Sequence, residues 1–227
     1  MTIEEYFGDW SKVINLQEAN SILRKIRQSK QVICPSIKNV FRAFQYCSLN
    51  NLRVAIVGQD PYPNLHDNKP VATGIAFANA ADTLIKDYSP SLKVLRESVI
   101  DFTKPHGNIT FDPSLEKWEE QGVLLLNTAL TCKAWNVGSH RQLWESFIQH
   151  FLQSLSHYTI GCVYILMGNA ACSFEPYIDK TNNYIFKVKH PAWYARNKLP
   201  MPSDLWEMVN RVLIGQNGYG VEWYQEY

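Results

Sequence analysis

Four short apolar runs stand out in the pattern of hydrophobic and polar positions along the chain. They cover residues 54–58, 122–127, 162–169 and 183–191, and each ends in, or is followed by, polar or turn-forming residues. The first three are almost wholly apolar, which is typical of strands in a parallel sheet that is covered on both faces. The fourth alternates in part, so we expect it to lie nearer an edge. The pattern therefore predicts four strands of one sheet.

Segments with helical spacing of apolar residues separate these runs. Ser89 followed by Pro90 marks one helix start, Ser139 and Gln142 have the spacing of a capping box, and Ser203 precedes the last helix. The alternation of strands and helices implies right-handed crossovers. We therefore predict an α/β fold, a three-layer α/β/α sandwich with a central, mainly parallel four-stranded sheet. The predicted helices cover residues 16–28, 36–44, 89–102, 139–156 and 201–216.

The amino-acid composition indicates the general class of protein but does not indicate a function. The 227 residues contain no internal repeat or long linker, and 46% are hydrophobic, so we expect one domain over residues 1–227 with a substantial core. The five cysteines are odd in number and form no C-x-x-C pair, which argues against a disulfide framework and a zinc site. The net charge of +1 neither favours nor excludes nucleic acid as a partner.

The chain shows no run as long as a membrane span, and its acidic, aromatic start does not resemble a signal peptide. We expect a cytoplasmic protein without a membrane partner, or, for a viral source, one located in the host-cell nucleus or cytoplasm.

Polar side chains follow or end three of the predicted strands: Asp60, Asn127 and His190. The carboxyl ends of parallel strands lie along one edge of a sheet, and ligands bind at that edge in open α/β folds. The position of each residue alone is better explained by the preference of polar residues for the loops that follow strands. Together with the rigid Asp-Pro-Tyr-Pro turn at residues 60–63, they predict a functional site.

The motifs that are missing narrow the chemistry of this site. The sequence has no glycine-rich dinucleotide motif, no phosphate-loop motif, no nucleophile elbow and no metal-ligand spacing of histidines. We therefore expect no cofactor and no metal. A carboxylate base, an amide and an imidazole remain, with aromatic rings at Tyr62 and Phe77. This set suits a planar, hydrogen-bonding ligand such as a nucleobase.

At this point a family resemblance becomes clear. The chain resembles the family 1 uracil-DNA glycosylases in an ordered set of motifs that covers most of its length. The motifs are CPSIKNVFRAF (34–44), GQDPY (58–62), GIAFAN (74–79), SPSL (89–92), WEEQGVLLLNTALT (118–131), GSHRQLWESF (138–147) and HPAWYA (190–195).

The resemblance implies hydrolysis of the N-glycosidic bond of deoxyuridine that is flipped out of DNA. Asp60 would activate water, and His190 would hydrogen-bond uracil O2. Asn127 would read O4 and N3–H, and Phe77, in a stacking strand, would stack on the base. Tyr62 would exclude the methyl group of thymine. Gln59 completes the set of expected uracil-binding residues.

The resemblance also implies contacts with DNA and a set of partners. The expected partner is uracil-containing DNA, single- or double-stranded, bound by a monomer, with protein inhibitors of glycosylases as a further class. The family's intercalating leucine falls on Tyr194, beside the larger Trp193. Trp193 could take over this role, so the choice of wedge stays open between the two. We expect Tyr194→Ala to lower activity on duplex DNA much more than on single strands and to leave thermal stability nearly unchanged. The expected DNA-binding residues are Ser89, Ser91, Gly168, Asn169, Pro191, Ala192, Trp193, Tyr194, Arg196 and Lys198.

The sequence departs from the family pattern at several positions. Pro63 and Thr73 stand where the family usually has histidines, and Asn169 replaces a serine. Two other functions stay open. One is a non-catalytic DNA-binding or polymerase accessory protein on the same scaffold, which retention of the three polar residues disfavours. The other is an enzyme of free nucleosides, which the aromatic, basic loop at 193–198 disfavours.

Overall fold

The computed structural model describes residues 3–103 and 107–227, and a parallel four-stranded sheet lies at its centre. The strand order is β6–β2–β8–β9, and every pairing in this sheet is parallel. The predicted fold class is confirmed, each strand lies within its predicted range, and β9 lies at an edge as expected. The strands are β2 (Val54–Gly58), β6 (Val123–Asn127), β8 (Val163–Met167) and β9 (Tyr184–Val188).

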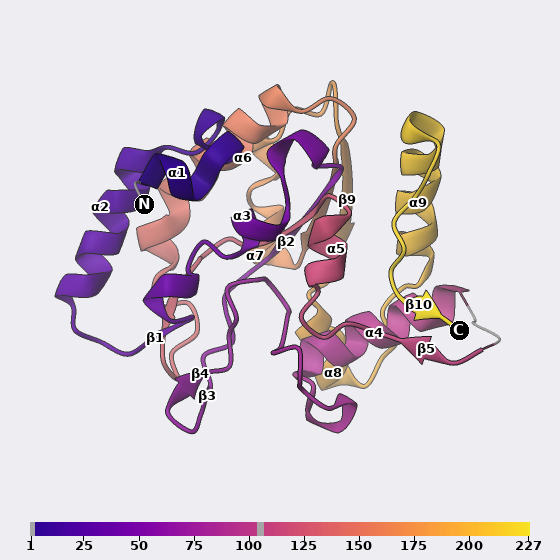
Figure 1. Ribbon diagram of the computed structural model, residues 1–227, viewed down its shortest axis with the longest axis horizontal. Helices are drawn as coiled ribbons and strands as arrows, with labels where there is room; N and C mark the ends of the chain where they lie inside the picture. The colour runs from indigo at the N-terminus through magenta and orange to yellow at the C-terminus, as the bar shows by residue number, and fades with distance from the viewer. Residues whose placement is uncertain (1–2, 104–106) are drawn as a thin grey trace.

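Helices cover both faces of the sheet because successive strand residues point to opposite sides. Val54 and Ile56 pack in one buried cluster with residues of α4, α5, α8 and α9, whereas Ala55 and Val57 pack with residues of α1, α2, α3, α6 and α7. The two groups of helices form the outer layers seen in Figure 1. The helices are α1 (Ile3–Phe7), α2 (Leu16–Gln28), α3 (Ala43–Tyr46), α4 (Pro90–Thr103), α5 (Glu116–Glu120), α6 (Arg141–Tyr158), α7 (Asn169–Cys172), α8 (Pro191–Asn197) and α9 (Asp204–Asn217).

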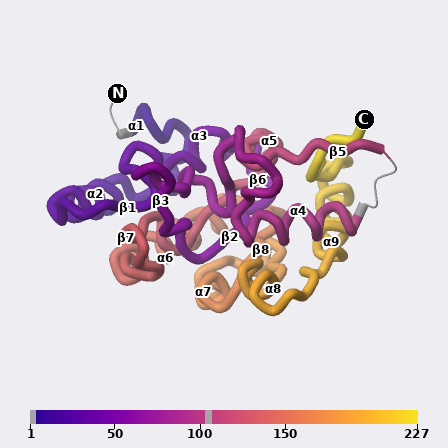
Figure 2. Tube along the Cα trace, turned by 90° about the horizontal axis from the view of Figure 1, so that it is seen from below, coloured from indigo at the N-terminus to yellow at the C-terminus, as the bar shows by residue number. Residues whose placement is uncertain are grey.

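In the part of the chain that the structure describes, three short antiparallel ladders supplement the central sheet. They pair β1 (Ile33–Cys34) with β7 (Cys132–Lys133), β3 (Leu65–His66) with β4 (Lys69–Pro70), and β5 (Ile109–Thr110) with β10 (Gln225–Glu226). In Figure 2, β2 lies in the middle of the molecule beside β8, with β7 on the side of α2 and α8 on the side of α9. Within residues 3–103 and 107–227, no helix is long and apolar enough to cross a membrane.

Two helix predictions need correction. Residues 36–44 do not form one helix but a series of tight turns that leads into the start of α3. Their hydrogen bonds join residues three apart in the chain, such as Arg42 N–H to Asn39 O at 3.1 Å. The predicted capping box at Ser139 is also wrong, since α6 starts at Arg141. The Ser139 hydroxyl instead accepts from Lys133 N–H and donates to the Asn136 carbonyl, which closes the loop before the helix.

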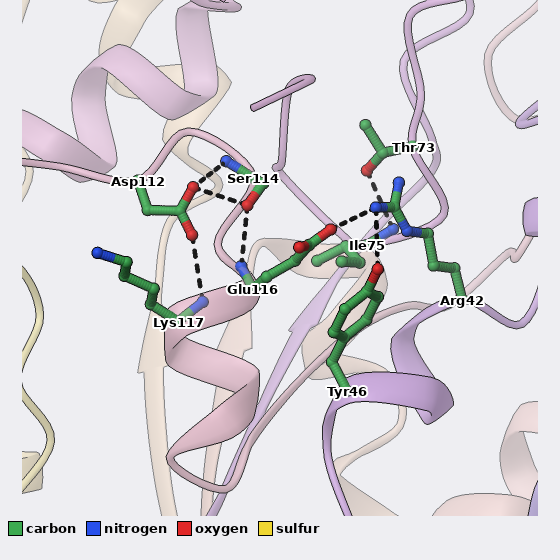
Figure 3. A network of polar contacts seen from close by, with 8 residues as sticks. All are labelled: Arg42, Tyr46, Thr73, Ile75, Asp112, Ser114, Glu116 and Lys117. Atoms are coloured by element: carbon green, nitrogen blue, oxygen red, sulfur yellow. Dashed lines mark hydrogen bonds and ion pairs between the residues drawn. The ribbon is translucent and has the colours of Figure 1, made fainter. Parts of the chain in front are cut away.

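A polar network anchors α5, the helix that leads into β6 (Figure 3). Asp112 Oδ1 accepts from the N–H (2.9 Å) and hydroxyl (2.6 Å) of Ser114, and Oδ2 accepts from Lys117 N–H (3.2 Å). Glu116 in this first turn forms an ion pair with Arg42, from the segment before α3. The bond to Lys117 N–H satisfies one of the N–H groups that a helix start leaves without partners. These contacts fix α5 and thereby the start of β6.

Candidate active site

The turn after β2 brings the end of β6 close to the carboxylate predicted as the base. A Cβ atom at Gly58 would lie 2.6 Å from Asn127 Oδ1 and 2.7 Å from the Phe77 ring, so only glycine permits this approach. The backbone continues the contact beyond the strands, since Ala129 N–H donates to the Gln59 carbonyl at 3.0 Å. The first predicted strand end therefore packs directly against the second.

Asp60 is buried and surrounded by hydrogen-bond donors. Its side chain is 3% exposed. Oδ1 accepts from Gly138 N–H at 3.1 Å, and Oδ2 accepts from Gln59 Nε2 at 3.0 Å. Arg141 donates to Oδ2 through both Nε (3.1 Å) and Nη2 (2.9 Å). Donors alone suit an ionised carboxylate, whose oxygens only accept.

His190 lies directly before α8 and has a defined proton arrangement. Its Nδ1 accepts from Ala192 N–H at 3.1 Å, so the proton of the neutral ring is on Nε2. Burial and the positive charge of Arg196 lower the pKa of His190 to about 4, although Asp60 acts in the opposite direction. The ring is therefore neutral near pH 7 and can donate through Nε2.

The predicted stacking residue does not lie in a strand. Residues 74–79 form turns, and Phe77 has a left-handed backbone with φ of 67°. The Tyr62 hydroxyl donates to the Phe77 carbonyl at 2.8 Å and holds this turn. Non-glycine residues in this conformation are strained and concentrate at functional sites. The Phe77 ring lies 5.6 Å from the His190 ring, centroid to centroid.

One cavity at the strand ends unites these residues. Asp60, Tyr62, Phe77, Asn127 and His190 all line it. They come from four separate segments, and the expected convergence on one edge of the sheet is what the structure shows. Gln59 is adjacent, but its side chain contacts Asp60. Within the described ranges, no three histidine, cysteine, aspartate or glutamate side chains gather as a metal site.

Comparison with known proteins identifies the family. A family model described as the Uracil DNA glycosylase superfamily matches residues 44–214. The chain belongs to this superfamily.

Relatives and solved structures agree with this membership. A uracil-DNA glycosylase of Escherichia coli (strain K12 / DH10B) is 37% identical over 203 residues, covering 87% of this chain and 83% of the relative. One of Francisella tularensis subsp. tularensis (strain SCHU S4 / Schu 4) is 32% identical over 198 residues, covering 85% and 84%. The crystal structure of mimivirus uracil-DNA glycosylase shares the fold, with a TM-score of 0.77 at 20% identity over 98% of this chain and 93% of that one.

The residues expected from the glycosylase family to contact phosphates stand at the starts of two helices, α4 and α7. Ser89 precedes α4, and its N–H and hydroxyl are both held by the Asn79 side chain at 2.8 Å. Ser91 is buried and lines the cavity itself. Gly168 donates its N–H to the Val188 carbonyl at 2.8 Å, and exposed Asn169 begins α7.

The expected wedge residues differ in exposure. Tyr194 is 8% exposed and belongs to a core cluster, whereas Trp193 is only partly buried against it. Lys189 Nζ lies 3.6 Å from the centroid of the Trp193 ring. This packing argues against the expectation that Tyr194→Ala leaves stability unchanged. Elsewhere on α8, Pro191 is buried, and the backbone N–H of Ala192 donates to His190. Arg196 is exposed, as is Lys198 just after the end of the helix.

Three residues of the glycosylase site were missed by the sequence interpretation. Arg141 and Gly138 contact Asp60, and buried Asn79 positions Ser89. All three lie within quoted motifs, but nothing in their spacing indicates these contacts. The only signal was the presence of a polar side chain or a glycine in a motif near the predicted site.

Proposed function

We propose that this chain hydrolyses the N-glycosidic bond of deoxyuridine in DNA, releasing free uracil and leaving an abasic site. The observation that carries the proposal is the single cavity that joins Asp60, Phe77, Asn127 and His190. It is supported by membership of the glycosylase superfamily and by the names of the curated relatives.

The residues supply the parts of a base-recognition site. An extruded base stacks on the ring of Phe77. The amide of Asn127 offers one donor and one acceptor, which match O4 and N3–H of uracil, whereas cytosine reverses both groups. Tyr62 fills the side of the cavity that would meet a methyl group at C5. The site therefore favours uracil over cytosine and thymine.

Asp60 and His190 divide the chemistry. Asp60 accepts a proton from water as the water oxygen bonds to the sugar C1′, and its charge favours a cationic sugar. The C1′–N1 bond breaks, and its electron pair leaves with uracil. The neutral His190 ring donates a hydrogen bond from Nε2 to O2, where negative charge develops. A proton from solvent then completes free uracil.

We also propose that the enzyme is monofunctional, meaning that it does not cut the sugar–phosphate backbone. Lyase chemistry needs an amine nucleophile, and no lysine is among the described residues that line the cavity. A single-residue variant of mimivirus UNG has been solved in complex with UGI. Binding of a protein inhibitor to this chain stays a prediction.

The decisive experiment is release of uracil from an oligonucleotide with a single deoxyuridine, in the presence of a chelator. We expect free uracil and an uncleaved abasic strand from the wild type. Asp60→Asn should lose about two to four orders of magnitude in turnover, the usual contribution of a positioned base, while it keeps fold and DNA affinity. Asp204→Asn, which removes an exposed carboxylate at the start of α9, is the matched control. DNA binding without uracil release by the wild type would instead support the non-catalytic alternative.

A further inference from the structure

The ion pair between Arg141 and Asp60 conflicts with the proposed role of Asp60 as base. Oδ2 of Asp60 already accepts three hydrogen bonds, one from Gln59 and two from Arg141. A base must accept the proton of water, and its negative charge must face the developing positive charge of the sugar. A guanidinium on the same carboxylate opposes both, because it occupies the acceptor and cancels the charge.

The structure leaves Arg141 able to move away from Asp60. Arg141 is the first residue of α6, and its side chain is 48% exposed, against 3% for Asp60. The guanidinium lies against Gly138, where an added Cβ would be 3.2 Å from Nε. Gly138 has a positive φ of 79° and no side chain that would enclose the arginine. Its ion pair is thus buried on one side and open to solvent on the other.

We propose that Arg141 exchanges Asp60 for a phosphate of the bound DNA strand, so that the substrate's backbone frees the base. The proposal rests on the proposed function. A nucleotide whose base enters the cavity keeps its flanking phosphates outside it, on the solvent side, where the exposed guanidinium of Arg141 can meet them. A guanidinium binds phosphate with the same forked geometry that it uses for carboxylate. Once paired with phosphate, its charge no longer opposes the positive sugar.

This exchange has a consequence for substrate choice. Free deoxyuridine has no phosphate to accept Arg141, so the guanidinium stays on Asp60 and Oδ2 stays occupied. The enzyme would then select the polymer by chemistry at the catalytic carboxylate as well as by affinity. The contact belongs to the backbone, so it carries no sequence information.

The direct test is a binding cycle with single phosphates neutralised. Asp60→Asn and Asp60→Asn/Arg141→Gln are compared on short oligonucleotides with one deoxyuridine and one methylphosphonate linkage, moved along the strand. We expect one linkage beside the uridine to weaken binding of Asp60→Asn by roughly fivefold or more and to leave the double variant unaffected, as for the loss of one charge-assisted hydrogen bond. Equal losses in both proteins at every linkage would overturn the proposal.

A second readout separates the exchange from a merely structural role. Arg141→Gln in the otherwise wild-type chain should reduce the slope of log kcat/KM against log salt by about 0.7 on single-stranded DNA and about 0.9 on duplex. Arg211→Gln, which removes an exposed guanidinium paired with Glu207 on α9, should leave the slope unchanged. A lower kcat with an unchanged slope would mean that Arg141 only orients Asp60, and would contradict the exchange.

The outcome is separable from that of the proposed function. If the wild type released no uracil, the function would fail, and the binding cycle would still decide whether Arg141 meets a phosphate. If Arg141→Gln unfolded, Arg141→Lys would replace it. It keeps the charge without the fork, and the proposal then expects the salt slope of the wild type with a weaker methylphosphonate effect. If the methylphosphonate weakened binding of Arg141→Lys as much as binding of the chain with native Arg141, that result would contradict the forked contact with phosphate.

Discussion

At the scale of single residues, the cavity holds a carboxylate and an imidazole in different environments. Asp60 is bonded only to donors, whereas His190 accepts at Nδ1 and is buried beside the positive charge of Arg196. The first arrangement favours a charged group and the second a neutral one. Such a division separates a base from a hydrogen-bond donor at the same pH.

We predict that His190 titrates far below an ordinary histidine. Burial and Arg196 lower its pKa to about 4, so the ring should stay neutral across the usual range of assays. The unfolded chain protonates near pH 6.5, so this group makes the free energy of unfolding rise with pH between about 4 and 6.5. A pH titration of the His190 ring by NMR measures the midpoint directly. A midpoint near the ordinary histidine value of about 6.5 would show that the site does not hold the ring neutral.

The sequence predicted these residues better than it predicted their partners. Asp60, Asn127 and His190 were predictable because strand ends in a parallel sheet share one edge. The contact between Arg141 and Asp60 was not predictable, because it depends on α6 starting two residues after the serine expected to cap it. The turn at Phe77 was missed because its apolar residues read as a strand, and only tertiary packing gives it a positive φ.

At the scale of elements, α8 combines DNA contact with core packing. Tyr194 faces the core cluster shared with α4 and α9, and Trp193 lies at the boundary with solvent. A wedge must leave its place to enter the base stack, which costs less for the side chain with less packing to lose. The structure therefore favours Trp193 for this role over Tyr194.

We predict opposite effects for the two aromatic residues. Trp193→Ala should reduce uracil release from duplex DNA far more than from single strands, because stacking contributes about 1–3 kcal/mol per base. Trp193→Phe should retain most of the activity. Tyr194→Ala should cost about 3 kcal/mol of stability and lower the melting temperature by roughly 6–12 °C. Uracil-release assays on the two substrates and melting curves check both variants. If Tyr194→Ala were stable but defective on duplex DNA, and Trp193→Ala were normal, Tyr194 would be the wedge.

Helix α5 contains a buried acid that predicts a second pH effect. Glu119 is 0% exposed, and burial raises its pKa well above the ordinary value, despite the opposing effect of Arg42. The folded chain then holds a proton that the unfolded chain releases above about pH 4.3, so this group lowers the free energy of unfolding as pH rises.

Replacing the Glu119 carboxyl with an amide should cancel this pH-dependent loss of stability. The stability of Glu119→Gln relative to wild type should increase from about pH 5 to about pH 8, as measured by urea denaturation, because the variant has no proton to lose. Glu120→Gln, at the exposed neighbouring position, should show no such trend. A difference between Glu119→Gln and wild type that stays constant with pH would mean that Glu119 does not titrate differently in the folded chain.

At the scale of the whole molecule, topology explains how distant residues form one pocket. Parallel order places the ends of β6, β2, β8 and β9 side by side, and the register pairs Gly58 with Asn127. This much follows from the apolar runs and the helices between them. The short ladders and loops follow from packing between segments far apart in the chain, which a local pattern does not encode.

The most direct test of the uracil pocket is the identity of the bases that the enzyme releases. Oligonucleotides that carry uracil, cytosine and thymine are incubated with wild type and Asn127→Asp, and the freed bases are measured by mass spectrometry. We predict that the wild type releases only uracil. Asn127→Asp should release uracil at least about tenfold more slowly and begin to release cytosine, because a carboxylate accepts from the exocyclic amine and each good base contact contributes about 1–3 kcal/mol of discrimination. Wild-type uracil release by Asn127→Asp, without any cytosine, would show that Asn127 does not read the base and that the pocket described here is not the site of recognition.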